Sequence, residues 1–514
     1  MPCSNFDVAV VGGGLAGMAT AARLQARGLR TVVLEAHGLV GGCAGYYRRR
    51  GFSFDVGATT LVDFEPGGVG GRLLDEIGMS PLAGEALPGY VAWLPDRRVV
   101  LHRDASAWRE ERLRALGSSP GHRAFWRLID VLAETFWKAS RDGLGLPLRS
   151  AGDLLQAIGA IGLRGLPLAR YARCTAGDAL RSFGLRDERP LSGLLSMLIE
   201  DTVHSTIERA PLVNAALGIT IRGAGLARFR GGMRGFWEAF VARYRSLGGM
   251  LRVGWRVDRI DADGGTYRLV TRKGTIAAAQ VVSALPVSVT AEIAPALVGR
   301  PLRPYLQRDA GGGGGAIAVF LGVPEEEVAG QALTHHQLLQ SYAHPLGDGN
   351  NMFVSVSASG DVDSAPPGHR SVMISTHCEL GCWQDLDRDT YERRREMAGE
   401  RLLGLARRVY PTLGERALVY EVATPRTYER YTGRPDGAVG GVRQTLANSN
   451  QHAVPHDLGP PGFWLAGDTT WPGLGTVACV LGSRIVAEGV VRRARRARVR
   501  IQSGAPTRTA MEVA

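Results

Sequence analysis

The chain has 514 residues, of which 45% are hydrophobic and 21% charged. This length exceeds one typical domain, and the composition excludes wholesale disorder. The formal net charge is +12, which would suit nucleic acid or an anionic membrane. Nearly all 61 basic residues are arginine, however, which points to genome composition, and no recognition motif supports a nucleic-acid partner.

The six cysteines are scattered, which predicts no disulfide framework and a reducing compartment. His377, Cys378 and Cys382 lie close together, but a structural metal site needs four ligands and no second cluster supplies them, so we predict no metal. No signal peptide precedes the first strand, and no run reaches the ~20 apolar residues of a spanning helix. We therefore expect a cytoplasmic protein, at most peripheral to the inner face of the membrane.

The first 36 residues predict a strand–loop–helix–strand unit. An apolar strand spans Asp7–Val11, a helix with Ala and Leu on one face spans Leu15–Arg27, and a second strand spans Thr31–Leu34. The loop between strand and helix reads G-x-G-x-x-G, with glycines at Gly12, Gly14 and Gly17.

These glycines have separate roles in a dinucleotide-binding unit. One makes the tight turn, one lets the backbone approach a pyrophosphate, and one lets the helix pack on the strand. Glu35 ends the second strand, where a carboxylate can accept hydrogen bonds from ribose hydroxyls. Because all parts occur in order, we predict that this unit binds a dinucleotide.

The region from about 70 to 210 has helical periodicity, and its aromatic residues at helical spacing predict a packed core. A turn, a helix and a strand around Val253–Ile260 follow, then a hairpin and a last strand at Gln280–Pro286. Farther on, Asn351–Asp361 and Ser371–His377 alternate as strands do, which predicts a second domain of sheet and helices. His335 and His336, with no third ligand in view, are interpreted as structural.

The stretch FWLAGDTTWPGLGTVACVLGSRIVAEGVV, Phe463–Val491, reads as a strand that stops at an acidic turn and restarts as a helix. The first amides of a helix lack internal partners and attract electron-rich groups. A basic run at Arg492–Arg500 follows, and we interpret residues 496–514 as a disordered tail, either solvated or facing lipid.

Three segments resemble the FAD enzymes of the amine oxidase and carotenoid desaturase superfamily: the N-terminal unit, GGCAGYYRRRGFSFDVGATTL after it, and the C-terminal GDTTWPGLGT. The resemblance implies FAD as cofactor and a Rossmann-type α/β domain interleaved with a sheet-plus-helix substrate domain. It also implies that the helix beginning near Gly475 aims its positive end at the flavin. Carried over position by position, the implied cofactor-binding residues are Gly12, Gly14, Leu15, Ala16, Gly17, Glu35, Ala36, Gly41, Gly42, Cys43, Gly57, Ala58, Thr59, Val257, Gly467, Asp468, Gly475, Thr476 and Val477.

The same segments, with YEVATPRTYERYTGRPDGAVGG at Tyr420–Gly441, look most like the carotenoid desaturase and isomerase (phytoene desaturase) family, in particular the C-3′,4′ carotenoid desaturase branch. That resemblance implies introduction of double bonds into an acyclic carotenoid or related polyene by hydride transfer to flavin. Oxygen or a quinone would then take the electrons. The domain boundaries implied are 1–70, 225–290 and 455–495 for FAD, and 71–224 and 291–454 for substrate.

Other activities stay open on the same scaffold: a carotenoid cis-trans isomerase, a retinol saturase-like reductase and, less favoured, a flavin amine oxidase. Amine oxidases of this superfamily typically keep a lysine near flavin N5, and this chain has none after Lys273. No catalytic residue is assigned. Glu200, Asp201 and His204 are candidate proton acceptors, and equally good candidates for helix-surface or capping residues.

Overall fold

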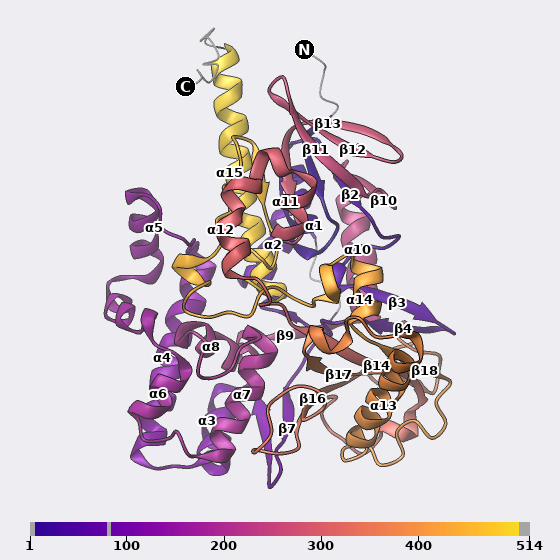
Figure 1. Ribbon diagram of the computed structural model, residues 1–514. Coiled ribbons are helices and arrows are strands. Elements are labelled where there is room, and N and C mark those ends of the chain that lie inside the picture. The colour runs from indigo at the N-terminus through magenta and orange to yellow at the C-terminus, as the bar shows by residue number, and fades with distance from the viewer. Residues whose placement is uncertain (1–5, 80–83, 503–514) are drawn as a thin grey trace.

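The computed structural model describes residues 6–79 and 84–502. Two seven-stranded sheets carry the molecule, and the chain passes between them several times (Figure 1). The first sheet runs in the order β10-β2-β1-β13-β12-β11, with β19 also paired to β13. Its strands are β1 (Phe6–Val11), β2 (Thr31–Glu35), β10 (Met250–Val253), β11 (Val257–Asp263), β12 (Thr266–Thr271), β13 (Gly274–Ser283) and β19 (Phe463–Leu465).

The predicted N-terminal unit is present. β1 is parallel to β2 on one side and to β13 on the other, and α1 (Leu15–Ala26) joins β1 to β2. The strand predicted at Val253–Ile260 is in fact two strands on opposite edges of the sheet. β10 pairs with β2, whereas β11 begins the antiparallel hairpin with β12.

The second sheet runs in the order β18-β14-β17-β16-β15-β7-β8 and is antiparallel except where β15 meets β7. Its strands are β7 (Gly89–Trp93), β8 (Arg98–His102), β14 (Gly315–Pro324), β15 (His335–Leu339), β16 (Asn351–Val356), β17 (His369–Cys378) and β18 (Val419–Ala423). The interpretation of 70–210 as helical misses β7 and β8, because these short strands pair with a partner far along the chain.

Smaller ribbons connect the two sheets. They are β3 (Tyr46–Arg49) with β4 (Phe52–Asp55), and β5 (Leu61–Val62) and β6 (Gly84–Ala86) on either side of β9 (Leu226–Phe229). The remaining helices are α2 (Val69–Glu76), α3 (Ala105–Leu116), α4 (Pro120–Asp142), α5 (Ala151–Ile161), α6 (Ala176–Ser182), α7 (Arg189–Val203), α8 (Leu212–Ile219), α9 (Ile221–Ala224), α10 (Gly232–Ser246), α11 (Val287–Ile293), α12 (Arg300–Arg308), α13 (Arg388–Ala406), α14 (Pro425–Thr432) and α15 (Thr476–Gln502). Helices α3 to α8 gather on one side as a helical lobe (Figure 1).

The last helix closes the first domain. α15 packs along α1, and Trp464 on β19 lies against Gly489, where a Cβ would come within 2.5 Å of the indole. The helix begins at Thr476, as predicted, but it continues to Gln502, so residues 496–502 are helical and were wrongly interpreted as part of a disordered tail. The rest of that tail, 503–514, lies outside the described residues.

Candidate functional site

The two N-terminal glycine motifs lie side by side. Gly41 donates its backbone N–H to the carbonyl of Gly13 at 2.9 Å, and a Cβ on Gly42 would reach the Cα of Gly14 at 3.5 Å. At Gly17 a Cβ would lie 2.0 Å from the carbonyl oxygen of Gly12, so the helix can approach the strand only because this residue is glycine.

Gly14, in contrast, faces open space. It is the N-cap of α1 without a side-chain cap, and a Cβ there would meet no atom within 4 Å. The amides of Leu15, Ala16 and Gly17 are therefore the uncapped start of a helix beside an opening. Uncapped amides at a positive helix end fit the pyrophosphate of a dinucleotide.

Glu35 has a role that the pattern did not predict. Its carboxylate accepts the backbone N–H of Gly13 at 2.6 Å and of His37 at 2.7 Å, so it holds the glycine loop against the end of β2. Burial raises the pKa of this carboxyl, although the two N–H donors oppose that effect. The backbone N–H of Trp255 donates to the backbone carbonyl of Glu35 at 2.8 Å, so Val257 follows two residues after a contact with the end of β2. Ala36 lies between Glu35 and His37, whose backbone N–H the Glu35 carboxylate accepts.

The segment at 57–59 lies against the second glycine motif. A Cβ on Gly57 would come within 2.3 Å of the carbonyl of Cys43, while Ala58 packs on the core of the first domain. Thr59 is buried, and its carbonyl accepts a hydrogen bond from Arg228 at 3.2 Å. This loop thus spans the seam between the two sheets.

The C-terminal motif reaches the same place from the other side. Gly467 lies next to Ala284, whose carbonyl also faces Gly12. Asp468 pairs with Arg434 at 2.5 Å, both side chains being mostly buried. Burial alone would lower the pKa of Arg434, but Asp468 raises it above its usual value. Arg434 lies in the segment Tyr420–Gly441 that resembles the carotenoid desaturase family, but no role was predicted for it, because the spacing of a loop arginine does not reveal its partner.

At the start of α15, Gly475 has φ +102° and open space where a Cβ would be. Thr476 Oγ1 accepts the N–H of Val62 at 3.5 Å. Val477 packs against both the core of the first domain and the core of the helical lobe. The N-terminal end of α15 therefore lies where the core of the first domain meets the core of the helical lobe, and the residues around it fit a flavin placed there.

A cluster of polar side chains lies at the C-terminal end of α7, a helix that contacts β15 of the second sheet. We call it the α7 cluster, and its members are Glu200, Asp201, His204, Arg222, Gln337, Asn351 and His377. Asn351 Nδ2 donates to Glu200 Oε2 at 2.5 Å, and His377 Nδ1 lies 3.5 Å from the same oxygen. The sequence pattern missed the role of His377, which stood out only beside two cysteines.

Three titratable side chains of this cluster are partly accessible to solvent. Asp201 keeps 40% of its side-chain surface, His377 27% and Glu200 17%. Burial is the largest influence on the pKa of each of the three groups, and it raises the pKa of Asp201. In the Glu200–His377 pair the partners outweigh burial, so the pKa of Glu200 is lowered and that of His377 is raised.

His335 and His336 each hydrogen-bond to other side chains of the protein. His336 bonds to Trp93 and Tyr410, and His335 to Ser355 at 3.1 Å. Within residues 6–79 and 84–502, no group of three or more His, Cys, Asp or Glu side chains is arranged to hold a metal ion.

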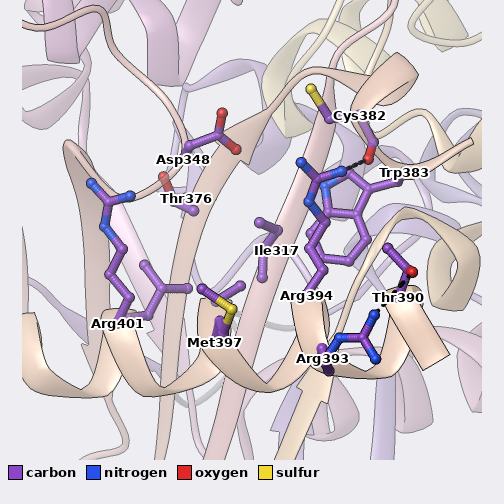
Figure 2. A pocket seen from close by; sticks show the side chains of 12 residues that line it. Ile317, Asp348, Thr376, Cys382, Trp383, Thr390, Arg393, Arg394, Met397 and Arg401 are labelled. Atoms are coloured by element: carbon purple, nitrogen blue, oxygen red, sulfur yellow. Dashed lines mark hydrogen bonds between the residues drawn. The ribbon is translucent and has the colours of Figure 1, made fainter. Parts of the chain in front are cut away.

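A separate cavity lies away from these residues. A cavity of about 560 Å³ opens on the outer face of the second sheet, between α13 and β17 (Figure 2). Arg394, Arg401 and Thr376 line it, and none of the predicted cofactor residues does. A cavity of about 30 Å³ includes Asp468 and Gln444 beside the C-terminal motif. Since side chains alternate along a strand, Thr376 faces the outer cavity while His377 faces α7.

Comparisons with known proteins agree with this geometry. A phytoene dehydrogenase from Streptomyces griseus is 27% identical over 520 residues, which cover 94% of each chain. A prolycopene isomerase from Daucus carota is 23% identical over 510 residues, 95% of this chain and 80% of that protein. Among solved structures, an oxidoreductase from Methanosarcina mazei superposes with a TM-score of 0.63 at 17% identity, over 94% of this chain and 99% of the other.

A model of a protein family described as flavin-containing amine oxidoreductases matches residues 15–491, nearly the whole chain. The enzymes of that family are oxidoreductases, and a dinucleotide-binding unit in such an enzyme holds its flavin as FAD. The chain therefore belongs to the flavin-containing amine oxidoreductase family, as an FAD-dependent enzyme.

Proposed function

We propose that this enzyme introduces double bonds into a long acyclic polyene of the carotenoid class. The observation that carries the proposal is similarity over at least 94% of the chain to a phytoene dehydrogenase and a prolycopene isomerase. The likeness thus extends across the middle of the chain, where substrate choice resides. Lys273 lies in the turn between β12 and β13 at the cofactor sheet, which argues against the amine oxidase alternative.

In this proposal the cofactor residues keep the roles implied by the resemblance. The amides of Leu15 and Ala16 with the glycines beside them hold the pyrophosphate, and Glu35 the ribose. Val257 offers its backbone to the adenine, Asp468 meets the ribityl chain, and the start of α15 stabilises negative charge on the ring. FAD supplies the hydride acceptor.

Membrane contact is part of the proposal, because a carotenoid is delivered from lipid. The helical lobe exposes apolar side chains on α5 and the turn after it, among them Leu155 at 71% and Leu163 at 78%. Arg164 and Arg170 lie exposed beside them, a combination typical of helices that lie on anionic lipid. The described residues contain no helix long and apolar enough to span a bilayer.

The test is an absorption spectrum of an acyclic carotenoid in liposomes, incubated with the FAD-loaded enzyme and either oxygen or a quinone. Each added double bond lengthens the conjugated system, so desaturation moves the bands to longer wavelength. Isomerisation, which the similarity to a prolycopene isomerase makes the second candidate, would change the cis band with little shift. A shift to shorter wavelength would indicate reduction, and no change would refute a carotenoid substrate.

A further inference from the structure

Desaturation removes two hydrogens from neighbouring carbons, and only one leaves as hydride. The hydride takes both electrons of its C–H bond to FAD. The second hydrogen leaves as a proton, and the electrons of its C–H bond form the new double bond. A group of the protein must therefore accept a proton beside the flavin.

His204 lies beside the cofactor motif. A Cβ on Gly440 would come within 2.6 Å of its Cε1, and a Cβ on Gly441 within 2.1 Å of the carbonyl of Asp468. The imidazole is therefore separated from the flavin motif by two glycines. Arg434, which binds Asp468, also donates to the carbonyl of Gly440 at 2.6 Å and fixes this contact.

The backbone of His204 holds the ring in an unusual position. The residue caps α7 with φ +52° and ψ +30°, the left-handed region that residues other than glycine seldom adopt. Its Nδ1 is buried without a hydrogen-bond partner. Within the described residues Nε2 makes no hydrogen bond and, unlike Nδ1, is not fully buried, so it is free to accept a proton. Strain of this kind gathers at functional sites.

His377 packs against the ring of His204, with centroids 4.9 Å apart in an edge-to-face arrangement. On its other side His377 faces Glu200 at 3.5 Å, and Glu200 is fixed by Asn351. Three elements thus meet: α7 supplies Glu200 and His204, and β16 and β17 supply Asn351 and His377.

We propose that His204 Nε2 accepts the proton that leaves the polyene, and that the Glu200–His377 pair positions its ring. The inference rests on the proposed desaturase function. Burial, then the neighbouring His377, lowers the pKa of His204 well below 6.5, so the ring is neutral at physiological pH. A weak base suffices, because a C–H bond next to a carbon that loses hydride is strongly acidic.

The charged groups around the pair act in known directions. Arg443 and Arg434, on the segment that carries Gly440, also lower the pKa of His204. Burial lowers the pKa of His377, but Glu200 and Asp201 raise it above 6.5 overall, which favours the protonated form of His377 beside Glu200.

The experiment compares His204→Asn with wild type, because asparagine tolerates the left-handed backbone. We expect kcat for polyene desaturation to fall about 10²- to 10⁴-fold, while KM and the FAD content stay unchanged. His344→Asn, at an exposed histidine of a neighbouring loop, is the control and should be as active as wild type. A His204→Asn enzyme within about threefold of wild type would overturn the acceptor role.

Glu200→Gln tests the positioning role. Without the carboxylate the pKa of His377 should fall, its repulsion of a charged His204 should weaken, and the acid limb of the pH–rate profile should move to higher pH. Imidazole NMR of the FAD-loaded protein gives an independent reading: the His377 signal should titrate above 6.5 in wild type and lower in the variant.

The outcomes separate the two proposals. An unmoved His377 titration in Glu200→Gln overturns the pair, whether or not a polyene is converted. A wild-type enzyme that converts no polyene refutes the proposed function and the acceptor role with it. A loss of activity in Glu200→Gln without a moved acid limb refutes the positioning role and leaves only a structural one.

Discussion

Substitutions at two glycines of one loop should separate effects on FAD binding from effects on helix packing. At Gly14 a Cβ would enter open space, and the backbone has φ −70°, which alanine adopts freely. At Gly17 a Cβ would lie 2.0 Å from the carbonyl oxygen of Gly12, about 1 Å inside the 3.0 Å limit of real Cβ contacts. Gly14→Ala and Gly17→Ala should therefore fail in different ways.

For Gly14→Ala the cost to the fold is that of a poorer N-cap, about 1 kcal/mol. The new methyl group, however, occupies the space through which a pyrophosphate meets the first amides of α1. Losing one charge-assisted hydrogen bond costs about 1.5–3 kcal/mol, which weakens FAD binding about tenfold to 150-fold. We expect the melting temperature of the protein freed of FAD to fall by less than about 4 °C.

For Gly17→Ala the helix must move away from the strand. Such overpacking costs about 1–3 kcal/mol or more, so the protein freed of FAD should itself melt earlier. Fluorescence titration with FAD and thermal melts of both variants, with and without FAD, measure the two effects. If Gly14→Ala bound FAD as wild type does, or if Gly17→Ala were as stable as wild type, the assignment of this loop would be refuted.

Three further changes test other parts of the molecule. Arg434→Met should release FAD more readily and destabilise the protein, because it leaves a buried carboxylate unpaired at a cost of about 3–5 kcal/mol; a variant with wild-type FAD content would contradict this role. Leu155→Ser with Leu163→Ser should weaken co-sedimentation with anionic vesicles and leave detergent-solubilised turnover unchanged; equal sedimentation would exclude this face. Glu200→Gln should lower the melting temperature most between about pH 4.5 and 6.5. The pKa of Glu200 is lowered in the folded protein, so the stability that Glu200 contributes is lost as the pH falls below this window. The pKa of His377 is raised, so the stability that His377 contributes is lost as the pH rises above it. A difference independent of pH would show that the pair contributes nothing.

Much of the cofactor domain could be predicted because its signals are local. β1, the glycine loop, α1 and β2 follow one another within 30 residues, and each restricts the next. The start of α15 could be predicted for the same reason. β7 and β8 were missed because they are short, lie between helices and pair through β15, a partner far along the chain.

The α7 cluster shows where pattern reasoning stops. Glu200, Asp201 and His204 were candidates because a carboxylate or an imidazole can accept a proton. His377 stood out only next to Cys378, from which it points away along β17. Their meeting depends on how α7 crosses the second sheet, and no spacing in the sequence records that. Arg434 and its buried partner Asp468 are another such case.

If the substrate is the proposed polyene, the polar α7 cluster poses a physical problem, because a hydrocarbon satisfies no hydrogen bond. Part of the cluster is satisfied internally: Asn351 and His377 contact Glu200, and Gln337 donates to Asp201 and accepts from Arg222, each at 3.2 Å. His204 Nδ1 and two nitrogens of Arg222 stay buried without a partner. Such a surface can stabilise charge in a transition state, but it does little to position a polyene. We therefore expect substitutions in the cluster to change the rate of reaction, and substitutions in the apolar walls to change which bond is desaturated.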